Sequence, residues 1–495
     1  MSRPTDVRVT GAAVFMIPVR TRMPLKFGAQ VVDSVTCGRV AVEVEDAAGR
    51  RAVGWGETPL SAQWGWPSSE PHSLREQAMI RLVQACAAAL VDFPESGHAL
   101  EIGHAFRHEV LDRLAAAAHE PPLAEQIPEL ASLICWSPFD LALHDAFGTL
   151  HGLDVYATYG SDFLTRDLAD LYGRPEERRR FQGRYPAEFL VKNPPAALQA
   201  WHLIGGLDPL AADELRGDEP QDGHPVILGD WIDRDGLDSL KVKLRGNDLE
   251  WDIDRLVRAG MIGMQHGVRH FCADFNCTVT DPAYVHAALD AVAERLPALP
   301  GLLRYVEQPF PYDLVASPID VHSISARTLL LLDESAHDWT HVARGRELGW
   351  NGVALKTCKT QSGALLSLCW ARDHGMAIMV QDLTNPMLAV IPHLRLAAHA
   401  GTFAGVETNA SQFYPDASLP EAAIHPGMYR RREGKVRLDS LAGPGFGMRV
   451  AEIGRALPPP SAAAGTLADA GAAARLGSAA RLGSAARLGS ARERT

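Results

Sequence analysis

The sequence predicts an α/β protein in which an N-terminal α+β domain precedes a parallel (β/α) barrel. Between Lys241 and Lys356, five short apolar runs each end in one or two charged residues. The segments between these runs are long enough for a helix and two turns. Upstream, residues 7–57 contain Val- and Thr-rich runs separated by turn residues. Buried runs that stop at a charge, repeated at βα spacing, are typical of a barrel whose site lies at the strand C-termini.

The composition indicates a large globular protein without a nucleic-acid or membrane partner. The chain has 495 residues, 46% of them hydrophobic, and a formal net charge of −12. This length favours two domains and a tail. No Lys/Arg-rich stripe, membrane-length apolar run or signal-peptide core occurs, and the seven cysteines form no C-x-x-C. We therefore expect a cytoplasmic protein with reduced, mostly buried thiols.

The N-terminal region predicts a meander of strands followed by helices. The expected strands are 7–19, 31–45 and 52–57, and the expected helices are 76–91 and 102–118. Ser137 before Pro138, with Asp140 at the third position, predicts the start of another helix that runs to Gly152. The loops at 21–28 and 61–67 mix Gly, aromatic and other residues, and they fit solvated connections and substrate lids equally well.

The barrel is predicted to begin with a strand at 200–206, with His202 near its end. A lone His there is more often a structural hydrogen-bonding residue than a catalyst. Residues 155–236 are irregular and insertion-like, and the Asp, Gly and Pro content up to Leu240 indicates a missing or replaced first barrel helix. Later helices are expected at 249–264, 282–296 and 364–374.

Charged residues end seven of the predicted barrel strands. The five runs end at Lys241 and Lys243, at Asp274, at Glu307, at Asp333 and Glu334, and at Lys356, and the last two strands end at Asp382 and Glu407. Asp382 and Glu407 fit a helix cap, a loop acid or a binding role. For the first five, unrelated surface charges are the alternative to a shared site.

These residue types suit chemistry on a carboxylate. Side chains two apart on a strand share a face, so Lys241 and Lys243 both point into the barrel, and we expect their mutual repulsion to lower at least one pKa. Asp274, Glu307 and Asp333 converge from successive strands, and three carboxylates in a small volume need a cation. Oxygen ligands favour Mg²⁺ or Mn²⁺ over zinc. The alternative is a salt-bridge network of these acids with the lysines.

A divalent ion between opposed lysines predicts a specific reaction. The metal binds the substrate carboxylate and stabilises the enolate that forms when the α-proton leaves. One lysine abstracts that proton. Lys356, approaching from across the barrel, returns a proton on the opposite face or stabilises charge while a β-group leaves.

The motifs Lys241-Val-Lys, Asp274-Phe-Asn, Val306-Glu-Gln-Pro, Asp333-Glu-Ser and Leu355-Lys resemble the enolase superfamily, in its muconate-lactonizing-enzyme and mandelate-racemase group. The segments from Ser137 and from Gly443 resemble those that precede and close the family's barrel. The resemblance implies a capping domain over a modified (β/α)7β TIM-type barrel. It also implies Asp274, Glu307 and Asp333 as Mg²⁺ ligands, Lys243 as base, Lys241 as its neighbour and Lys356 as second acid/base.

The weaker substrate-binding candidates are Asn276, Asp382, Glu407 and His202, together with Arg22, Lys26, Trp64 and Trp66 in the lid that the resemblance implies. The seventh strand ends in Gln381-Asp382 without a His, which weakens an acid-sugar dehydratase and favours a racemase, epimerase or cycloisomerase. A dipeptide substrate has only Glu407-Thr-Asn as a loose counterpart of its usual motif. A Schiff-base lysine aldolase and a non-catalytic scaffold also stay open.

The predicted domains are a cap at 1–136, a barrel at 137–428, a segment at 429–455 that returns to the cap, and a low-complexity tail at 456–495. Three copies of Ala-Arg-Leu-Gly-Ser-Ala mark that tail, and we expect it to be disordered. The expected partners are a small carboxylate and further copies of the chain.

Overall fold

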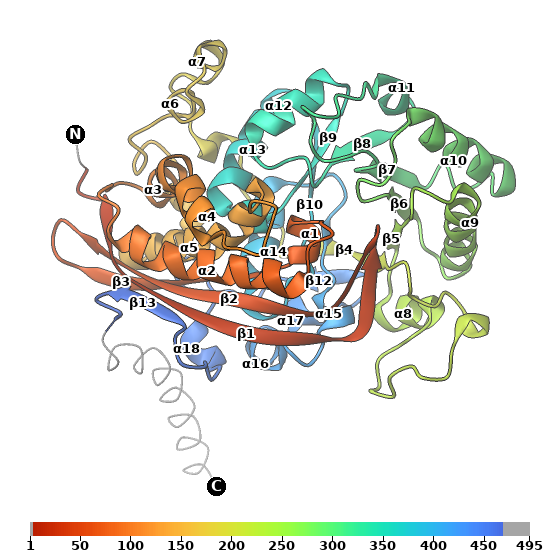
Figure 1. The fold of residues 1–495 in the computed structure, drawn as a ribbon, viewed down its shortest axis with the longest axis horizontal. Coiled ribbons are helices and arrows are strands. Elements are labelled where there is room, and N and C mark those ends of the chain that lie inside the picture. The colour runs from red at the N-terminus through yellow and green to blue at the C-terminus, as the bar shows by residue number, and fades with distance from the viewer. Residues whose placement is uncertain (1–2, 469–495) are drawn as a thin grey trace, which may run out of the picture.

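The computed structural model describes residues 3–468 and contains an antiparallel sheet with helices, set against a parallel barrel (Figure 1). The barrel consists of eight parallel strands, β4 to β11, and it closes because β11 pairs with β4. Seven βα connections and a final strand make the predicted (β/α)7β order. The predicted fold class is therefore confirmed.

The cap sheet has the strand order β13-β1-β2-β3. Its strands are β1 (Val7–Phe27), β2 (Gln30–Asp46), β3 (Arg51–Pro59) and β13 (Ala462–Gly465). Its helices are α1 (Ala62–Gly65), α2 (His72–Val91), α3 (Ala99–Phe106), α4 (Asp112–Ala118) and α5 (Glu129–His151). Helices α2 and α5 cover one face of the sheet (Figure 1).

The hairpin β1–β2 is longer than the sequence predicts. Strand β1 does not end near Pro18 but continues to Phe27, which pairs with Gln30 across a two-residue turn. A register shift between Arg20 and Leu25 absorbs the irregularity. The predicted loop at 21–28 is therefore mostly strand. Its backbone N–H and C=O groups hydrogen-bond to β2, whereas those of an isolated loop would hydrogen-bond to water.

Helix α5 begins eight residues before the predicted start at Ser137, so the predicted domain boundary at 136/137 falls inside it. Pro138 lies within the helix, although proline costs a helix interior about 3 kcal/mol. The buried turns from Leu130 to Trp136 outweigh that cost through packing. Close contact with β3 depends on Gly54 and Gly56, where a Cβ atom would come within 2.0 Å and 2.1 Å of helix backbone atoms.

The barrel strands are β4 (Ala197–Ile204), β5 (Ser239–Lys243), β6 (His270–Asp274), β7 (Leu303–Glu307), β8 (Leu329–Leu332), β9 (Gly352–Leu355), β10 (Ala377–Val380) and β11 (Val406–Glu407). The connecting helices are α8 (Leu228–Asp235), α9 (Leu249–Gln265), α10 (Pro282–Arg295), α11 (His322–Ser325), α12 (Trp339–Glu347), α13 (Gln361–Asp373) and α14 (Val390–Ala400). The first barrel helix is thus present but short, and the sequence prediction that it is missing or replaced is wrong.

Shorter elements complete the chain. Helices α6 (Leu168–Tyr172) and α7 (Pro175–Phe181) precede β4, and α15 (Ala410–Phe413), α16 (Leu419–Ile424), α17 (Pro426–Tyr429) and α18 (Val450–Ile453) follow β11. Strand β12 (Lys435–Arg437) pairs antiparallel with β4. The expected disorder from 456 onward is wrong for β13, which pairs with β1. The three sequence repeats lie outside the described residues.

All seven cysteines are free thiols, and six of them are buried, as the sequence predicts. Along residues 3–468, no helix combines the length and apolarity that crossing a bilayer requires. A cytoplasmic location stays a prediction.

We predict that Gly56→Ala lowers the free energy of unfolding by about 3 kcal/mol, since the added methyl group would overlap the backbone of α5. Gly301→Ala is the matched control, because the nearest atom to its added Cβ lies 3.8 Å away. Urea unfolding of both variants checks this prediction. Equal midpoints for the two variants would contradict the close contact between β3 and α5.

Candidate active site

The alternation of side chains along the barrel strands builds the site in two layers. Trp201, Cys272, Tyr305, Leu331 and Met379 form an apolar plug inside the barrel. Two positions further along four of these strands come Asp274, Glu307, Asp333 and Gln381. Because side chains two apart share a face, each polar group lies directly above the plug at the C-terminal rim.

Strand register places Lys243 beside two acids. Lys243 pairs in register with Asp274, and Asp274 pairs with Glu307. Lys243 Nζ lies 2.5 Å from Asp274 Oδ2, and the other oxygen of Asp274 accepts a hydrogen bond from the backbone N–H of Asn276 at 2.9 Å. Lys243 and Asp274 are therefore in direct contact.

Lys241 is the hub of the floor of the site. Its ammonium group donates to Glu307 at 2.6 Å and to Glu407 at 2.8 Å, and it lies 3.0 Å from Asp274. The side-chain amide of Gln381 also donates a hydrogen bond to Glu307, at 2.5 Å. Burial opposes the charge, but the three carboxylates raise the pKa of Lys241 well above its ordinary value. The pKa of Lys241 thus moves opposite to the lowering that we expected for at least one of the two lysines.

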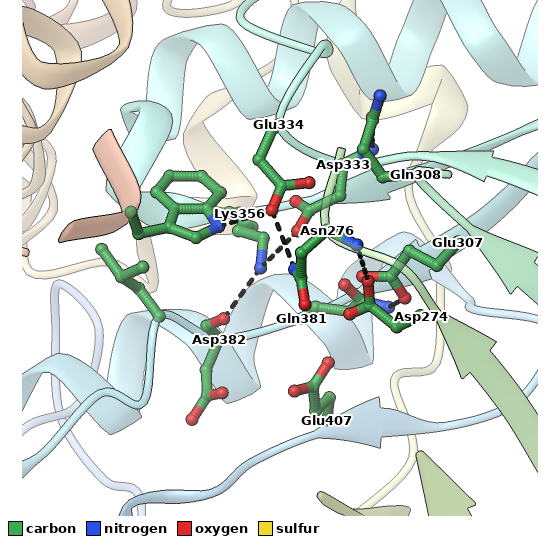
Figure 2. Close-up of polar contacts among 12 residues, drawn as sticks. Asp274, Asn276, Glu307, Gln308, Asp333, Glu334, Lys356, Gln381, Asp382 and Glu407 are labelled. Carbon is green, nitrogen blue, oxygen red and sulfur yellow. Dashed lines mark hydrogen bonds and ion pairs between the residues drawn. The ribbon is translucent and has the colours of Figure 1, made fainter. Parts of the chain in front are cut away.

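Lys356 approaches from the opposite wall. Strands β5 and β9 are four places apart in the closed ring of eight, so they face each other across the barrel. Lys356 Nζ lies 3.1 Å from Asp333 Oδ2, donates to the backbone carbonyl of Asp382 at 2.9 Å, and sits 5.0 Å from the centre of the Trp64 ring (Figure 2). Burial works against its charge, yet Asp333 raises the pKa of Lys356 above its ordinary value.

A further lysine, Lys359, escaped the sequence analysis. It is buried, it donates to the backbone carbonyl of Asp333, and its Nζ lies 3.6 Å from Asp333 Oδ1. Burial lowers the pKa of Lys359, against the attraction of Asp333. The signal was present in the sequence as a second lysine three residues after Lys356, where a 3-10 turn (Thr357–Lys359) brings it back to the rim.

Glu334 also belongs to the site, although sequence reasoning noted it only as a strand end. Its Oε1 accepts hydrogen bonds from Asn276 Nδ2 and from Trp64 Nε1, each at 3.0 Å. Its carboxyl group faces the same space as those of Asp274, Glu307 and Asp333 (Figure 2). Burial, with Asp333 adding, raises the pKa of Glu334.

The last two predicted acids form a second pair on the rim. Asn409 Nδ2 donates to Glu407 at 2.5 Å and to Asp382 at 3.1 Å, so one amide holds both carboxyl groups. Burial raises the pKa of Asp382 to about 7, and Glu407 adds to the rise. Asp382 and Glu407 line the same pocket as Lys241, Lys243 and Lys356.

Buried negative charge exceeds buried positive charge in this network. The connected acids are Asp274, Glu307, Asp333, Glu334, Asp382 and Glu407, and the lysines are Lys241, Lys243, Lys356 and Lys359. Full ionisation of six carboxyl and four ammonium groups leaves a net charge of −2. Burying that excess in a medium of low dielectric is unfavourable, so the site must take up protons or bind a cation.

The donor set fits a divalent cation. Asp333 Oδ1, Glu334 Oε2 and Asn276 Oδ1 are buried oxygens without a hydrogen-bond partner, and hard oxygen ligands suit Mg²⁺ or Mn²⁺. However, the carboxyl groups of the predicted ligands Asp274, Glu307 and Asp333 do not converge on one point. Between residues 3 and 468, three ligand atoms all within 4.8 Å of one another occur only elsewhere, at Glu129, His337 and His341. Lys241 instead pairs with Asp274 and Glu307, as the salt-bridge alternative predicts.

The pocket above the network has an apolar wall. Hairpin β1–β2 contributes Leu25, Phe27, Val32 and Val35, and Leu203, Leu383 and Tyr414 continue the wall. Trp64, one of the predicted lid residues, also lines this pocket. The hairpin residues escaped the sequence analysis because only the strand pairing of 21–35 shows which side chains face inward.

Other predicted lid contacts lie elsewhere. Arg22 pairs with Asp222 at 2.7 Å and tethers the hairpin to the segment before α8. Lys26 contacts Gly206 through its backbone, and its side chain does not line the pocket. Trp66 donates to Glu125 within the cap core.

His202 also lies outside the lysine pocket, the cavity that Lys241, Lys243 and Lys356 line. It is buried, and its Nδ1 lies 3.1 Å from the guanidinium of Arg431. These positions do not support the proposed substrate contacts of Arg22, Lys26, Trp66 and His202.

Backbone strain is concentrated around the rim. Within residues 3–468, six of the eight non-glycine residues with positive φ follow strands β6, β7, β9 and β10: Asn276, Cys277, Gln308, Thr360, Thr384 and Met387. Such conformations persist only where the surrounding structure fixes them, and they cluster at functional sites. Gln308 illustrates this constraint, since its side chain accepts from the backbone N–H of Asp333 at 2.7 Å and fixes that strand end.

Comparison with known proteins identifies the class of the barrel. Residues 228–453 match the model of the enolase C-terminal domain-like family. This match covers the barrel from α8 onward, and it confirms the resemblance to the enolase superfamily seen in the sequence. No curated protein sequence matches the chain.

Solved structures share the fold at low sequence identity. A dipeptide epimerase from Enterococcus faecalis V583, complexed with Mg and L-Leu-L-Tyr, is 16% identical with a TM-score of 0.58, covering 89% of this chain and 99% of its own. The N-succinyl Arg/Lys racemase from Bacillus cereus is 14% identical with a TM-score of 0.54, covering 89% and 95%. A mandelate racemase/muconate lactonizing protein from Herpetosiphon aurantiacus is 20% identical with a TM-score of 0.55, covering 90% and 98%.

We predict that Lys241→Met lowers the free energy of unfolding at pH 8 by about 3–5 kcal/mol, because three buried carboxylates lose their shared cation. The loss should shrink at pH 5, where those carboxyl groups take up protons more readily and no longer need the ammonium group. The exposed Lys192→Met is the control. A loss at pH 5 equal to that at pH 8 would contradict this electrostatic role.

Proposed function

We propose that the protein is an isomerase that removes the α-proton of a carboxylate substrate, as a racemase, epimerase or cycloisomerase. The observation that carries the proposal is the placement of Lys243 and Lys356 on opposite strands of one barrel, both lining one pocket. Two amines on opposite sides of a bound carbon acid can remove a proton from one face and deliver one to the other.

The roles of the lysines differ in this proposal. Lys243 is the base, because it lies at the level of the acids and lines the pocket. Lys356 is the acid on the other face. Asp333 keeps its ammonium group charged, and that group lies over the Trp64 ring. Lys241 is a positioning residue, since its ammonium group is committed to Asp274, Glu307 and Glu407 on the floor of the site.

Asp274, Glu307 and Asp333 are the proposed ligands of Mg²⁺ or Mn²⁺, and Glu334 and Asn276 stand beside them with free oxygens. The net charge of −2 supports one divalent ion. When bound, such an ion neutralises the substrate carboxylate and the charge that develops on it. The dipeptide epimerase from Enterococcus faecalis V583 is complexed with Mg, which supports the same cofactor class.

The pocket wall supports a substrate with an apolar substituent. Outside the charged network, the lining consists of aliphatic and aromatic side chains with Ser61 and Thr384. A charged substituent would lose its hydration there without gaining a partner. The same wall argues against the acid-sugar dehydratase alternative, because several substrate hydroxyl groups would go unpaired.

The two alternatives from other classes receive less support. A Schiff-base aldolase needs a neutral amine at Lys243 or Lys356, and Lys356 is paired with the carboxylate of Asp333. A scaffold without chemistry has no use for a buried network with excess charge, which costs stability. Borohydride reduction in the presence of a carbonyl substrate distinguishes the aldolase by covalent trapping.

The proposed reaction predicts exchange of the α-proton with solvent. With Mg²⁺ in D₂O, a substrate with an apolar substituent should gain deuterium at the α-carbon, as followed by NMR. Both Lys243→Ala and Lys356→Ala should reduce racemisation by at least about 10²-fold, the usual contribution of an acid or base. Exchange from one enantiomer should survive in Lys356→Ala and disappear in Lys243→Ala.

Controls separate the cation from the lysines. EDTA should abolish exchange in the wild type and Mg²⁺ should restore it, while Lys192→Ala should retain full activity. Full exchange in EDTA would overturn the metal requirement. Full racemisation in Lys243→Ala would overturn the two-base assignment.

We further predict that Val35→Asp lowers kcat/KM for an apolar substrate by at least about 10-fold, because it places an unpaired charge in the wall. Val315→Asp, at a site 78% exposed, is the control and should leave kcat/KM unchanged. Steady-state kinetics on both variants measure the effect. An unchanged value for Val35→Asp would contradict the assignment of the hairpin as the substrate wall.

A further inference from the structure

A second group of potential metal ligands lies where the cap meets the barrel. Glu129 is the first residue of α5, and His337 and His341 flank Asp338, which caps the N-terminus of α12. Each of the three offers one ligand atom, and these atoms all lie within 4.8 Å of one another. None of the three lines the lysine pocket.

The distances approach those of a zinc site. Glu129 Oε2 lies 3.1 Å from His337 Nδ1 and 3.8 Å from His341 Nε2. Tetrahedral ligands with bonds of 2.0–2.1 Å lie about 3.3 Å from one another. Small side-chain movements therefore suffice to bring all three atoms to one ion.

A hydrogen-bonded carboxylate already orients one of the histidines. Asp338 Oδ1 accepts from His341 Nδ1 at 2.9 Å, which leaves the lone pair of His341 Nε2 facing Glu129. Asp338 is itself fixed by the backbone N–H of Thr340 at 2.8 Å and by Arg107 at 2.9 Å. A carboxylate behind a ligating histidine is the usual outer support of zinc sites.

The charges around the group allow a divalent ion. Arg107 contacts Asp338 and also Glu129 Oε1, at 2.7 Å, so it offsets one of the two acids. With neutral histidines, one negative charge is left for a cation. The other nitrogen of His337 is buried and without a hydrogen-bond partner, so its link to Glu129 is the one polar contact of that ring in the described chain.

Solvent reaches the group. The side chain of Glu129 is 40% exposed and that of His341 is 29% exposed. An ion can therefore enter from outside, and three protein ligands leave a fourth position for water. Two imidazoles with one carboxylate select zinc-like ions over Mg²⁺.

We propose that Glu129, His337 and His341 form a site for Zn²⁺ or a similar transition-metal ion that joins α5 of the cap to the start of α12. His337 lies four residues after Asp333. A bound ion thus holds the far end of the loop that carries Asp333, which lines the lysine pocket. This second ion takes no part in the chemistry of the proposed reaction.

The test uses the full chain, stripped with a chelator and then titrated with Zn²⁺ in excess Mg²⁺. We expect one zinc per chain by calorimetry, and Co²⁺ should give the visible bands of four-coordinate cobalt. Glu129→Gln and His341→Ala should each weaken binding by at least 10-fold. Because Glu129 is partly exposed, its substitution keeps the fold, which circular dichroism verifies.

Asp333→Asn is the matched control, since it alters the lysine pocket and leaves the second group untouched. This variant should bind zinc like the wild type. Absence of zinc binding in the wild type, or equal affinity in Glu129→Gln and His341→Ala, overturns the proposal. Loss of zinc in Asp333→Asn alone also overturns it, because the ion would then belong to the lysine pocket.

Discussion

The two-residue alternation of side chains along eight closed strands is the constraint on which the site depends. It places an apolar plug at one level and polar groups one step above it, with Cys272 below Asp274 and Tyr305 below Glu307. A shift of one residue in any strand would exchange its inward and outward faces. The register that aligns Lys243, Asp274 and Glu307 therefore fixes which charged side chains are neighbours, whatever rotamers they adopt.

The charges that meet there are costly to bury, and their arrangement reflects that cost. Lys241 compensates three acids at once, whereas Lys356 and Lys359 share Asp333. Gln381 and Asn409 donate hydrogen bonds that hold carboxyl groups in place, and Gln308 accepts one from the backbone N–H of Asp333 and fixes that strand end. A network that carries excess negative charge and buried oxygens without hydrogen-bond partners is costly unless it takes up protons or a cation.

The sequence predicted the barrel because its strands are short apolar runs that end in charges, a signal that survives without tertiary information. It predicted Lys241, Lys243, Lys356 and the strand-end acids for the same reason, but not Lys359, which lies in a 3-10 turn beyond the strand. It did not reveal the start of α5, since the residues before Ser137 become helical by burial in the cap core, with Ala131 and Ile134 against Gly65 of α1, despite Pro138. Nor did it reveal the wall from Leu25 to Val35, because which side chains face inward depends on the pairing of β1 with β2.

Strand β13 gives the cap a property that the barrel alone would lack. Residues 462–465 pair with Gly11–Val14, so a segment from near the end of the chain covers the outer margin of β1. An uncovered strand margin offers unpaired backbone groups to other molecules and promotes aggregation. Residues 462–465 thus protect this strand edge from pairing with another copy of the chain. A chain shortened before residue 462 would lose that protection.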